Sequence, residues 1–320
     1  MPSLGLGCWK VARDVCAQTV YDAIRVGYRA LDCAADYGNE VEVGAGISRA
    51  IKEGIVTRDD LWITSKLWCT NHAPEHVQSA LAKTLSDLGL TYVDLYLIHF
   101  PIPLAYVPPE TRYPPGWTYD PAESVPRMVF ASVPLLDTWR AMSILWRAGT
   151  ARHVGVCNMT TGLLADLMRG AENEGLVIPE VLQVEMHPYL VQRNLTRFCA
   201  SYSIAVTAFS PLGAASYVEI GMATPSQSAL ADPVVTAIAA RLGATPAQVV
   251  LAWHLRRGVS AVPKSSHTVR LAENLGAVTV AHHITDEDVL AISALDRRQR
   301  FNDPAVFCEQ AFNTFCPIFD

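Results

Sequence analysis

The sequence predicts an α/β fold, a (β/α)8 barrel of the TIM type, and three observations lead to it. Short runs rich in β-branched and aromatic residues alternate with longer segments of helical period. About eight such runs are separated by helix-like segments, which favours a closed barrel over an open doubly wound sheet. The first turn, GLGCWK, lacks the third glycine of the GxGxxG loop typical of open nucleotide-binding sheets. We therefore expect one barrel domain over residues 1–320.

Each expected strand is a short apolar run that ends at a polar or turn residue. These strands span Ser3–Gly7, Arg29–Asp32, Leu61–Lys66, Leu95–His99, His153–Val156, Val181–Val184, Ala205–Ala208 and Ser260–Pro263. Each expected helix carries apolar residues at helical spacing. These helices span Arg13–Val26, Val41–Lys52, Pro74–Leu88, Leu135–Ala148, Thr160–Arg169, Gln192–Ser203, Pro233–Leu242, Pro246–Arg257, Val269–Leu275 and Asp286–Ala294.

Two stretches are expected to be irregular. Pro101–Pro126 contains IPLAYVPPETRYPPGWTYDP, which is too rich in proline for a helix. Phe301–Asp320 reads as an aromatic, turn-rich tail that we place over the barrel rim. Long loops in compact domains are often binding elements or lids, although a surface loop without a role is nearly as common a reading for the first stretch.

The composition excludes several classes of partner. The net charge is −6, which argues against a nucleic-acid groove or an anionic membrane surface as the partner. No apolar run approaches the roughly 20 residues that span a bilayer, and MPSLGLGCWK lacks the features of a secretion signal. Eight cysteines without CxxC pairs indicate reduced thiols and a cytoplasmic protein. Cys308 and Cys316 could pair or bind metal, but no histidine spacing supports a metal site.

Four polar residues stand where apolar runs end, at the positions that become catalytic at the carboxyl rim of a parallel barrel. They are Asp32, Tyr37, Lys66 and His99. Taken singly, each has an ordinary structural reading as a cap, a packing residue, an ion-pair member or a core histidine. Strand alternation, however, puts Lys66 and His99 at the ends of inward-facing rows on neighbouring strands, with Tyr37 at the start of the next helix.

Together these four residues can make a proton donor. Free tyrosine, with a pKa of about 10, is a poor acid at neutral pH, and a nearby ammonium favours its ionised form. We expect Lys66 to act on Tyr37 in this way, held by Asp32, while His99 orients a carbonyl group. Tyr37 is then the general acid when a carbonyl is reduced and the general base in the reverse reaction.

The chain resembles the aldo-keto reductase superfamily, whose catalytic tetrad is Asp, Tyr, Lys and His in this order. The resemblance is carried by GYRALDCAADYGNEVEVGAGI, ITSKLW, DLYLIHFPIP, QVEMHPYL and VPKS, which follow in the family's order. YPPGW, LMRGA, SYVEI and RFNDP…PIF narrow the resemblance to xylose reductases and related aldose reductases. It implies reduction of an aldehyde sugar such as D-xylose to its alcohol, with NADPH and with NADH as a second cofactor.

The resemblance also implies the residues that bind the cofactor. Asn158 and Gln183 are expected to bind the nicotinamide carboxamide, helped by Cys157, which replaces the family's serine and donates only weakly. The remaining positions are Phe209 on the nicotinamide ring, Ser210 and Leu212 at the pyrophosphate, Glu219 at the ribose hydroxyls of NADH, Lys264, Ser265, Ser266 and Arg270 around the 2′-phosphate, and Glu273 and Asn274 at the adenine. Phe209 replaces the common tyrosine, and Ser266 stands where xylose reductases often have asparagine. A solvated helix start is the alternative reading of Lys264 and Arg270.

By the same resemblance, a small-molecule carbonyl substrate lies among loops on the substrate side of the barrel. The expected pocket residues are Trp9, Trp68, His99, Phe100, Trp117 and Asn302, beside Tyr37. The bland reading of Trp9 and Trp68 is core packing. Xylose reductases imply a monomer or a homodimer. The usual hairpin before the first strand is expected to be missing or shortened.

Two alternatives stay open. The same mechanism would serve a reductase of sugar phosphates or of non-sugar aldehydes, which competition between substrates would distinguish. A barrel of this kind could also serve as a regulatory module that binds the cofactor without turnover.

Overall fold

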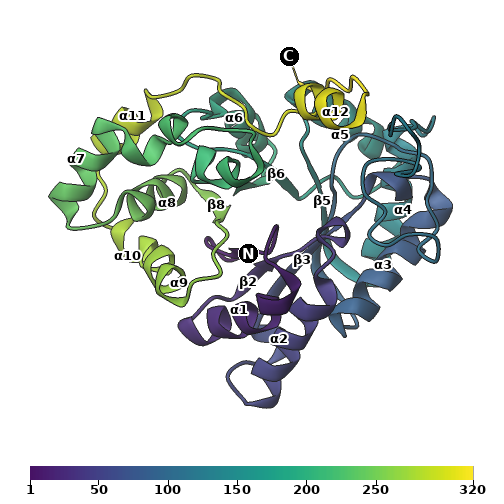
Figure 1. Ribbon diagram of the computed structural model, residues 1–320, viewed down its shortest axis with the longest axis horizontal. Helices are drawn as coiled ribbons and strands as arrows, with labels where there is room; N and C mark the ends of the chain where they lie inside the picture. The colour runs from purple at the N-terminus through teal and green to yellow at the C-terminus, as the bar shows by residue number, and fades with distance from the viewer. Residues whose placement is uncertain (320) are drawn as a thin grey trace. The chain divides into compact units, whose positions relative to one another are not determined.

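The computed structural model describes residues 1–319 and has the (β/α)8 barrel fold that the sequence predicts (Figure 1). Its strands form one eight-stranded sheet in chain order, and the described pairings β1–β2, β3–β4, β4–β5 and β7–β8 are all parallel. The strands are β1 Leu6–Gly7, β2 Ala30–Asp32, β3 Trp62–Leu67, β4 Val93–Ile98, β5 Ala151–Cys157, β6 Val181–Glu185, β7 Ala205–Phe209 and β8 Val259–Val262.

The helices alternate with these strands along the chain. They are α1 Arg13–Val26, α2 Glu40–Lys52, α3 Pro74–Leu88, α4 Leu135–Ala148, α5 Thr161–Asn173, α6 Arg193–Ser201, α7 Pro233–Leu242, α8 Pro246–Arg256, α9 Thr268–Leu275, α10 Ala277–Val280, α11 Asp286–Ser293 and α12 Pro304–Phe312. Short 3-10 helices lie at Ala35–Tyr37, Arg58–Asp60, Cys69–Asn71, Gly213–Ser216, Val218–Ile220, Pro225–Gln227 and Ala229–Ala231.

The chain contacts define two compact units, which we describe separately. Unit 1 comprises residues 1–32, 46–62 and 183–301, and unit 2 comprises residues 33–45, 63–182 and 302–319. In unit 1, a parallel bridge between Leu4 and Ala261 joins the N-terminal run to β8. One of its apolar clusters packs Trp253 of α8 against Val235 of α7 and Ile292 of α11. In α8, the Thr245 side chain accepts a bond from the backbone N–H of Gln248, which fixes the first turn.

In unit 2, the register of β3 and β4 sets two functional candidates side by side. Lys66 pairs with Leu97, and the backbone N–H of His99 donates to the carbonyl of Leu67 over 3.0 Å. Helix α3 begins with Pro74 at its first turn and ends at Gly89 in the left-handed conformation, with φ of +64°. Because Pro74 favours the start of a helix and Gly89 its end, these two residues explain why the predicted bounds of α3 were right.

The bounds of α1, α3, α4 and α7 agree with the prediction, and the other elements differ by a few residues at their ends. Two expectations were wrong. The tail is not turn-rich throughout, because it contains α12, the yellow helix near the C-terminus in Figure 1. Asp303 caps α12 by accepting from the backbone N–H of Ala305, and Pro304 occupies its first turn. Tyr37 does not start the next helix, since it ends a 3-10 helix and α2 begins at Glu40. Asp320 of the predicted tail lies outside the described residues.

Within residues 1–319, no single helix has both the length and the hydropathy of a membrane span. Only α7 and α8 taken together reach them, and these two helices are bent by 93° relative to each other.

Candidate active site

Lys66 and Tyr37 lie within hydrogen-bond distance in unit 2. Lys66 is the next-to-last residue of β3 and is fully buried. Its Nζ donates to the carbonyl oxygen of Cys33 over 2.8 Å and to the hydroxyl oxygen of Tyr37 over 3.0 Å. An ammonium at this distance stabilises negative charge on the phenolic oxygen, so the pair can exchange a proton with a bound ligand.

His99 lies directly after β4, and its ring lies close to those of Tyr37 and Trp68. Its ring centroid is 5.7 Å from that of Tyr37 and 5.1 Å from that of Trp68. Burial, and then the charge of Lys66, holds the pKa of His99 well below its usual value. The imidazole is therefore neutral near pH 7 and can present one N–H to a carbonyl oxygen. Its Nδ1 has no hydrogen-bond partner among residues 1–319.

The predicted acidic member, Asp32, belongs to unit 1. It ends β2, is 5% exposed, and accepts a hydrogen bond from Gln183 Nε2 over 2.6 Å. Three of the four predicted residues, Tyr37, Lys66 and His99, therefore lie in unit 2. Asp32 lies in unit 1 and contacts Gln183, a predicted cofactor residue of the same unit.

Asp36, next to Tyr37, is a candidate that the sequence reasoning missed. Burial raises the pKa of Asp36 to about 8, although the backbone N–H of Gly116 donates to it and opposes the shift. A carboxyl group that is protonated at pH 7 can donate a hydrogen bond to a hydroxyl. The signal in the sequence was an acidic residue placed directly before the candidate acid, in AADYG.

An aromatic wall of unit 2 lies beside His99. Trp68 contacts Trp117 edge to face, with ring centroids 4.8 Å apart, and Phe100 lies 5.1 Å from Trp117. Two further rings come from α12, since Phe307 and Phe312 lie 5.4 and 6.2 Å from Trp117. The sequence reasoning missed these two because it assigned no helix to the tail. Of the other predicted pocket residues, Asn302 lies in unit 2 at the start of the tail segment.

Trp9, the remaining predicted pocket residue, lies in unit 1. Its ring is 5.9 Å from that of Tyr217, and Tyr217 in turn stacks on Phe301 with centroids 5.6 Å apart. Burial of Tyr217 is complete, and its hydroxyl accepts a 2.9 Å bond from Ser210 Oγ. Ser210 has a φ of +46°, so the chain leaves β7 through a sharp turn just after Phe209.

Glu219, predicted at the cofactor ribose, forms an ion pair in unit 1. Its carboxylate lies 2.5 Å from Lys10 Nζ, which also donates to the carbonyl of Ser216. The hydrogen bond from Lys10 to the Glu219 carboxylate, together with the positive charge of Lys264, lowers the pKa of Glu219. Lys10 is a residue that the sequence reasoning missed, because its partner is more than two hundred positions away along the chain.

The predicted phosphate residues surround the start of α9 in unit 1. Lys264, Ser266 and Arg270 are exposed, while Ser265 is buried and accepts a 3.1 Å bond from the backbone N–H of His267. On α9 itself, Asn274 is 5% exposed. The two cationic side chains are thus accessible to an anion. Among the described residues no group of three or more His, Cys, Asp or Glu is arranged to hold a metal ion.

Asn158 follows β5 in unit 2 and is buried. Its φ is +56°, and its Nδ2 donates to the carbonyl of His99 over 2.9 Å. Its Oδ1 is buried and has no hydrogen-bond partner among residues 1–319. A buried acceptor of this kind is matched by an amide NH2 such as that of a carboxamide. The preceding Cys157 is fully buried.

The comparisons with known proteins point to one enzyme family. The model of the aldo/keto reductase family matches residues 3–297. A probable NAD(P)H-dependent D-xylose reductase of Aspergillus clavatus is 44% identical over 328 residues, covering 100% of this chain and 96% of the relative. The NAD(P)H-dependent D-xylose reductase of Scheffersomyces stipitis is 46% identical over 306 residues, covering 95% and 93%. The NADPH-dependent D-xylose reductase of Meyerozyma guilliermondii is 44% identical over 306 residues, covering 95% and 94%.

Proposed function

Because this chain belongs to the aldo/keto reductase family, we propose that it reduces the aldehyde of an open-chain aldose such as D-xylose to the alcohol, with NADPH and secondarily NADH. The single observation that carries the mechanism is the 3.0 Å contact between the buried Lys66 Nζ and the hydroxyl of the half-buried Tyr37, beside His99.

The proton chemistry belongs to the residues of unit 2. Tyr37 gives its phenolic proton to the carbonyl oxygen, and Lys66 stabilises the phenolate that remains. Neutral His99 donates an N–H to the same oxygen and fixes the direction from which the carbonyl is approached. Asp32 is the proposed acidic member of the tetrad.

The nicotinamide cofactor supplies the hydride, and the residues present fit it. The unpartnered Oδ1 of Asn158 suits the carboxamide, with Gln183 as the second amide partner. Exposed Lys264 and Arg270 suit a 2′-phosphate, because a dianion needs cations and a guanidinium can bind it through two hydrogen bonds. Phe209, Ser210 and Leu212 are assigned to the ring and the pyrophosphate, and Glu273 and Asn274 to the adenine.

The direct test measures loss of reduced-nicotinamide absorbance with D-xylose and other aldoses, using NADPH and NADH in parallel. The proposal requires turnover with at least one aldose and a higher kcat/KM with NADPH than with NADH. Folded protein that binds NADPH but turns over no aldose and no simple aldehyde would refute it.

The aromatic wall favours a second substrate class, an aldehyde with an apolar or aromatic body. Trp68, Phe100 and Trp117, with Phe307 and Phe312, offer ring faces and few polar atoms to such a substrate. Competition between D-xylose and benzaldehyde separates the two readings. A kcat/KM for benzaldehyde far above that for every aldose would assign the physiological role to non-sugar aldehydes.

We propose a cytoplasmic location and a monomer or homodimer. All eight cysteines are buried, and the sequence holds no CxxC pair, which suits a reducing compartment. Cell fractionation tests the compartment, and size-exclusion chromatography with light scattering tests the oligomeric state.

A further inference from the structure

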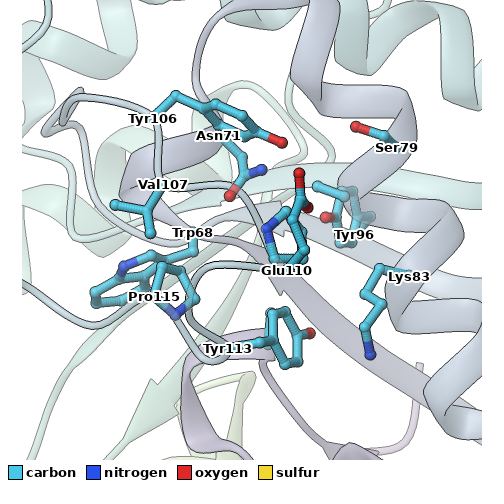
Figure 2. Close-up of a pocket in the computed structure, with 13 residues that line it drawn as sticks. Trp68, Asn71, Ser79, Lys83, Tyr96, Tyr106, Val107, Glu110, Tyr113 and Pro115 are labelled. Carbon is cyan, nitrogen blue, oxygen red and sulfur yellow. The ribbon is translucent and has the colours of Figure 1, made fainter.

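One cavity of unit 2 is lined by none of the proposed catalytic side chains. It has a volume of about 260 Å³ and opens between α3, β4 and the proline-rich segment 106–115. Figure 2 shows Trp68, Val107 and Pro115 on one side, with Ser79 and Lys83 of α3 on the other. Tyr37, Lys66 and His99 do not line it. The cavity is therefore a separate candidate site, although Trp68 borders both it and the aromatic wall.

The lining of this cavity is mostly aromatic and aliphatic. Four large rings contribute to it, those of Trp68, Tyr96, Tyr106 and Tyr113. Two prolines, two alanines and Val107 also line it, together with the polar residues Asn71, Ser79, Lys83 and Glu110. Flat rings and proline faces of this kind suit the faces of another ring. A cavity of about 150 Å³ is known to hold benzene, so this one has room for a substituted ring.

Two buried hydroxyls in the lining, those of Tyr96 and Tyr113, have no hydrogen-bond partner among residues 1–319. Tyr96 is completely buried in β4, and its hydroxyl has no hydrogen-bond partner among residues 1–319. Leaving such a group unpaired costs free energy, so a ligand that accepts its hydrogen bond gains affinity. Burial, with the nearby charge of Glu40, raises the pKa of Tyr96 well above its usual value. The hydroxyl therefore stays protonated and is available as a donor.

The cationic side chain in the lining is already neutralised. Lys83 forms an ion pair with Asp87 one turn along α3, and its Nζ lies 4.2 Å from the ring centroid of Tyr113. Glu110, the acidic residue in the lining, is exposed at the edge. The buried part of the lining thus presents the hydroxyls of Tyr96 and Tyr113 and no unpaired charge, which disfavours both anions and cations.

We propose that this cavity binds a small uncharged aromatic compound that carries one hydroxyl group, of the phenol class. Its ring lies among the four aromatic side chains, and its oxygen accepts the hydrogen bond of the Tyr96 hydroxyl. The ligand also contacts the ring of Trp68. The inference does not depend on the reductase activity, because it rests on the cavity alone.

The test uses 4-methylphenol as the probe and the full chain without cofactor, with the dissociation constant measured by calorimetry and by ligand-detected NMR. Ala80→Phe fills the cavity from α3, whereas Ala82→Phe, two residues along the same helix, adds the same ring at an exposed position outside the lining. We expect Ala80→Phe to weaken binding more than tenfold and Ala82→Phe to change it less than twofold. Both variants should keep the wild-type rate of D-xylose reduction.

Tyr96→Phe is the second variant, and it should weaken binding about two- to twelvefold, which is the value of one hydrogen bond. If both phenylalanine insertions abolish binding, this variant decides: weakening supports the site, and unchanged affinity overturns it. Absence of binding to the wild-type chain, or full binding to Ala80→Phe, also overturns it. Loss of binding in Trp117→Ala with retention in Ala80→Phe would assign the probe to the aromatic wall instead. An inactive enzyme that still binds the probe would refute the proposed function alone.

Discussion

Replacement of Lys66 by methionine isolates the contribution of its charge to proton transfer. The two side chains have similar length, and methionine fits a fully buried apolar position. The substitution removes the ammonium that lies 3.0 Å from the Tyr37 hydroxyl. It leaves the phenol itself, so any loss of rate reports on the charge and its hydrogen bond.

The geometry sets bounds on the expected effect. Two unit charges 3.0 Å apart interact by about 5 kcal/mol at an effective dielectric constant of about 20, which is an upper limit. A hydrogen bond to a charged group contributes about 1.5 kcal/mol at the lower end of measured values. Because about 1.4 kcal/mol corresponds to tenfold in rate, kcat for aldose reduction should fall between about tenfold and several thousandfold.

The assay compares kcat of wild type and Lys66→Met in both reaction directions over a range of pH. In alcohol oxidation Tyr37 must act as a base, so the variant should need a higher pH to reach half of its maximal rate. NADPH affinity, measured by fluorescence titration, should stay within about twofold, which shows that the fold and cofactor site are intact. A variant with kcat within threefold of wild type and an unmoved pH profile would refute the role assigned to Lys66.

Three further substitutions test other parts of the structure. Tyr37→Phe should lower kcat by about 10²- to 10⁴-fold, the range for a general acid, with NADPH binding unchanged; retained turnover would remove Tyr37 from that role. Lys264→Met should raise KM for NADPH much more than KM for NADH, since only NADPH carries the 2′-phosphate. Equal increases of the two KM values in steady-state assays would contradict the assignment. Burial lowers the pKa of His72 from 6.5 to about 4, so below pH 6.5 the unfolded chain binds a proton that the native chain does not, and native stability is lost as pH falls toward 4. His72→Phe should therefore remove up to about 3 kcal/mol of that loss, seen as a smaller difference between urea unfolding free energies at pH 7 and pH 4 than in wild type.

Local sequence signals were sufficient where one residue type decides the outcome. Pro74 and Gly89 delimit α3 because proline suits a first helical turn and glycine takes the left-handed conformation beyond the last one. Strand alternation likewise predicted that Lys66 and His99 lie on neighbouring strands, which the parallel register of β3 and β4 confirms. These features depend on spacing within a few residues, and spacing can be read from one chain.

Contacts between distant segments could not be predicted in this way. The ion pair of Lys10 with Glu219 joins two residues that are far apart in the sequence. Neither residue lies in a local sequence pattern that predicts its partner. Helix α12 was missed because its short aromatic sequence resembles a loop, although Asp303 and Pro304 form an ordinary helix start. The raised pKa of Asp36 arises from burial, which only the folded chain reveals.

The origin of the rings around Trp117 has an evolutionary consequence. Phe307 and Phe312 come from the last segment of the chain, while Tyr37, Lys66 and His99 come from its first third. On the proposed assignment of these rings to the substrate pocket, we expect mutations near the C-terminus to change which aldehydes are accepted without disturbing proton transfer. Chimeras that keep residues 1–301 and borrow the final helix from a relative offer a direct route to new selectivity.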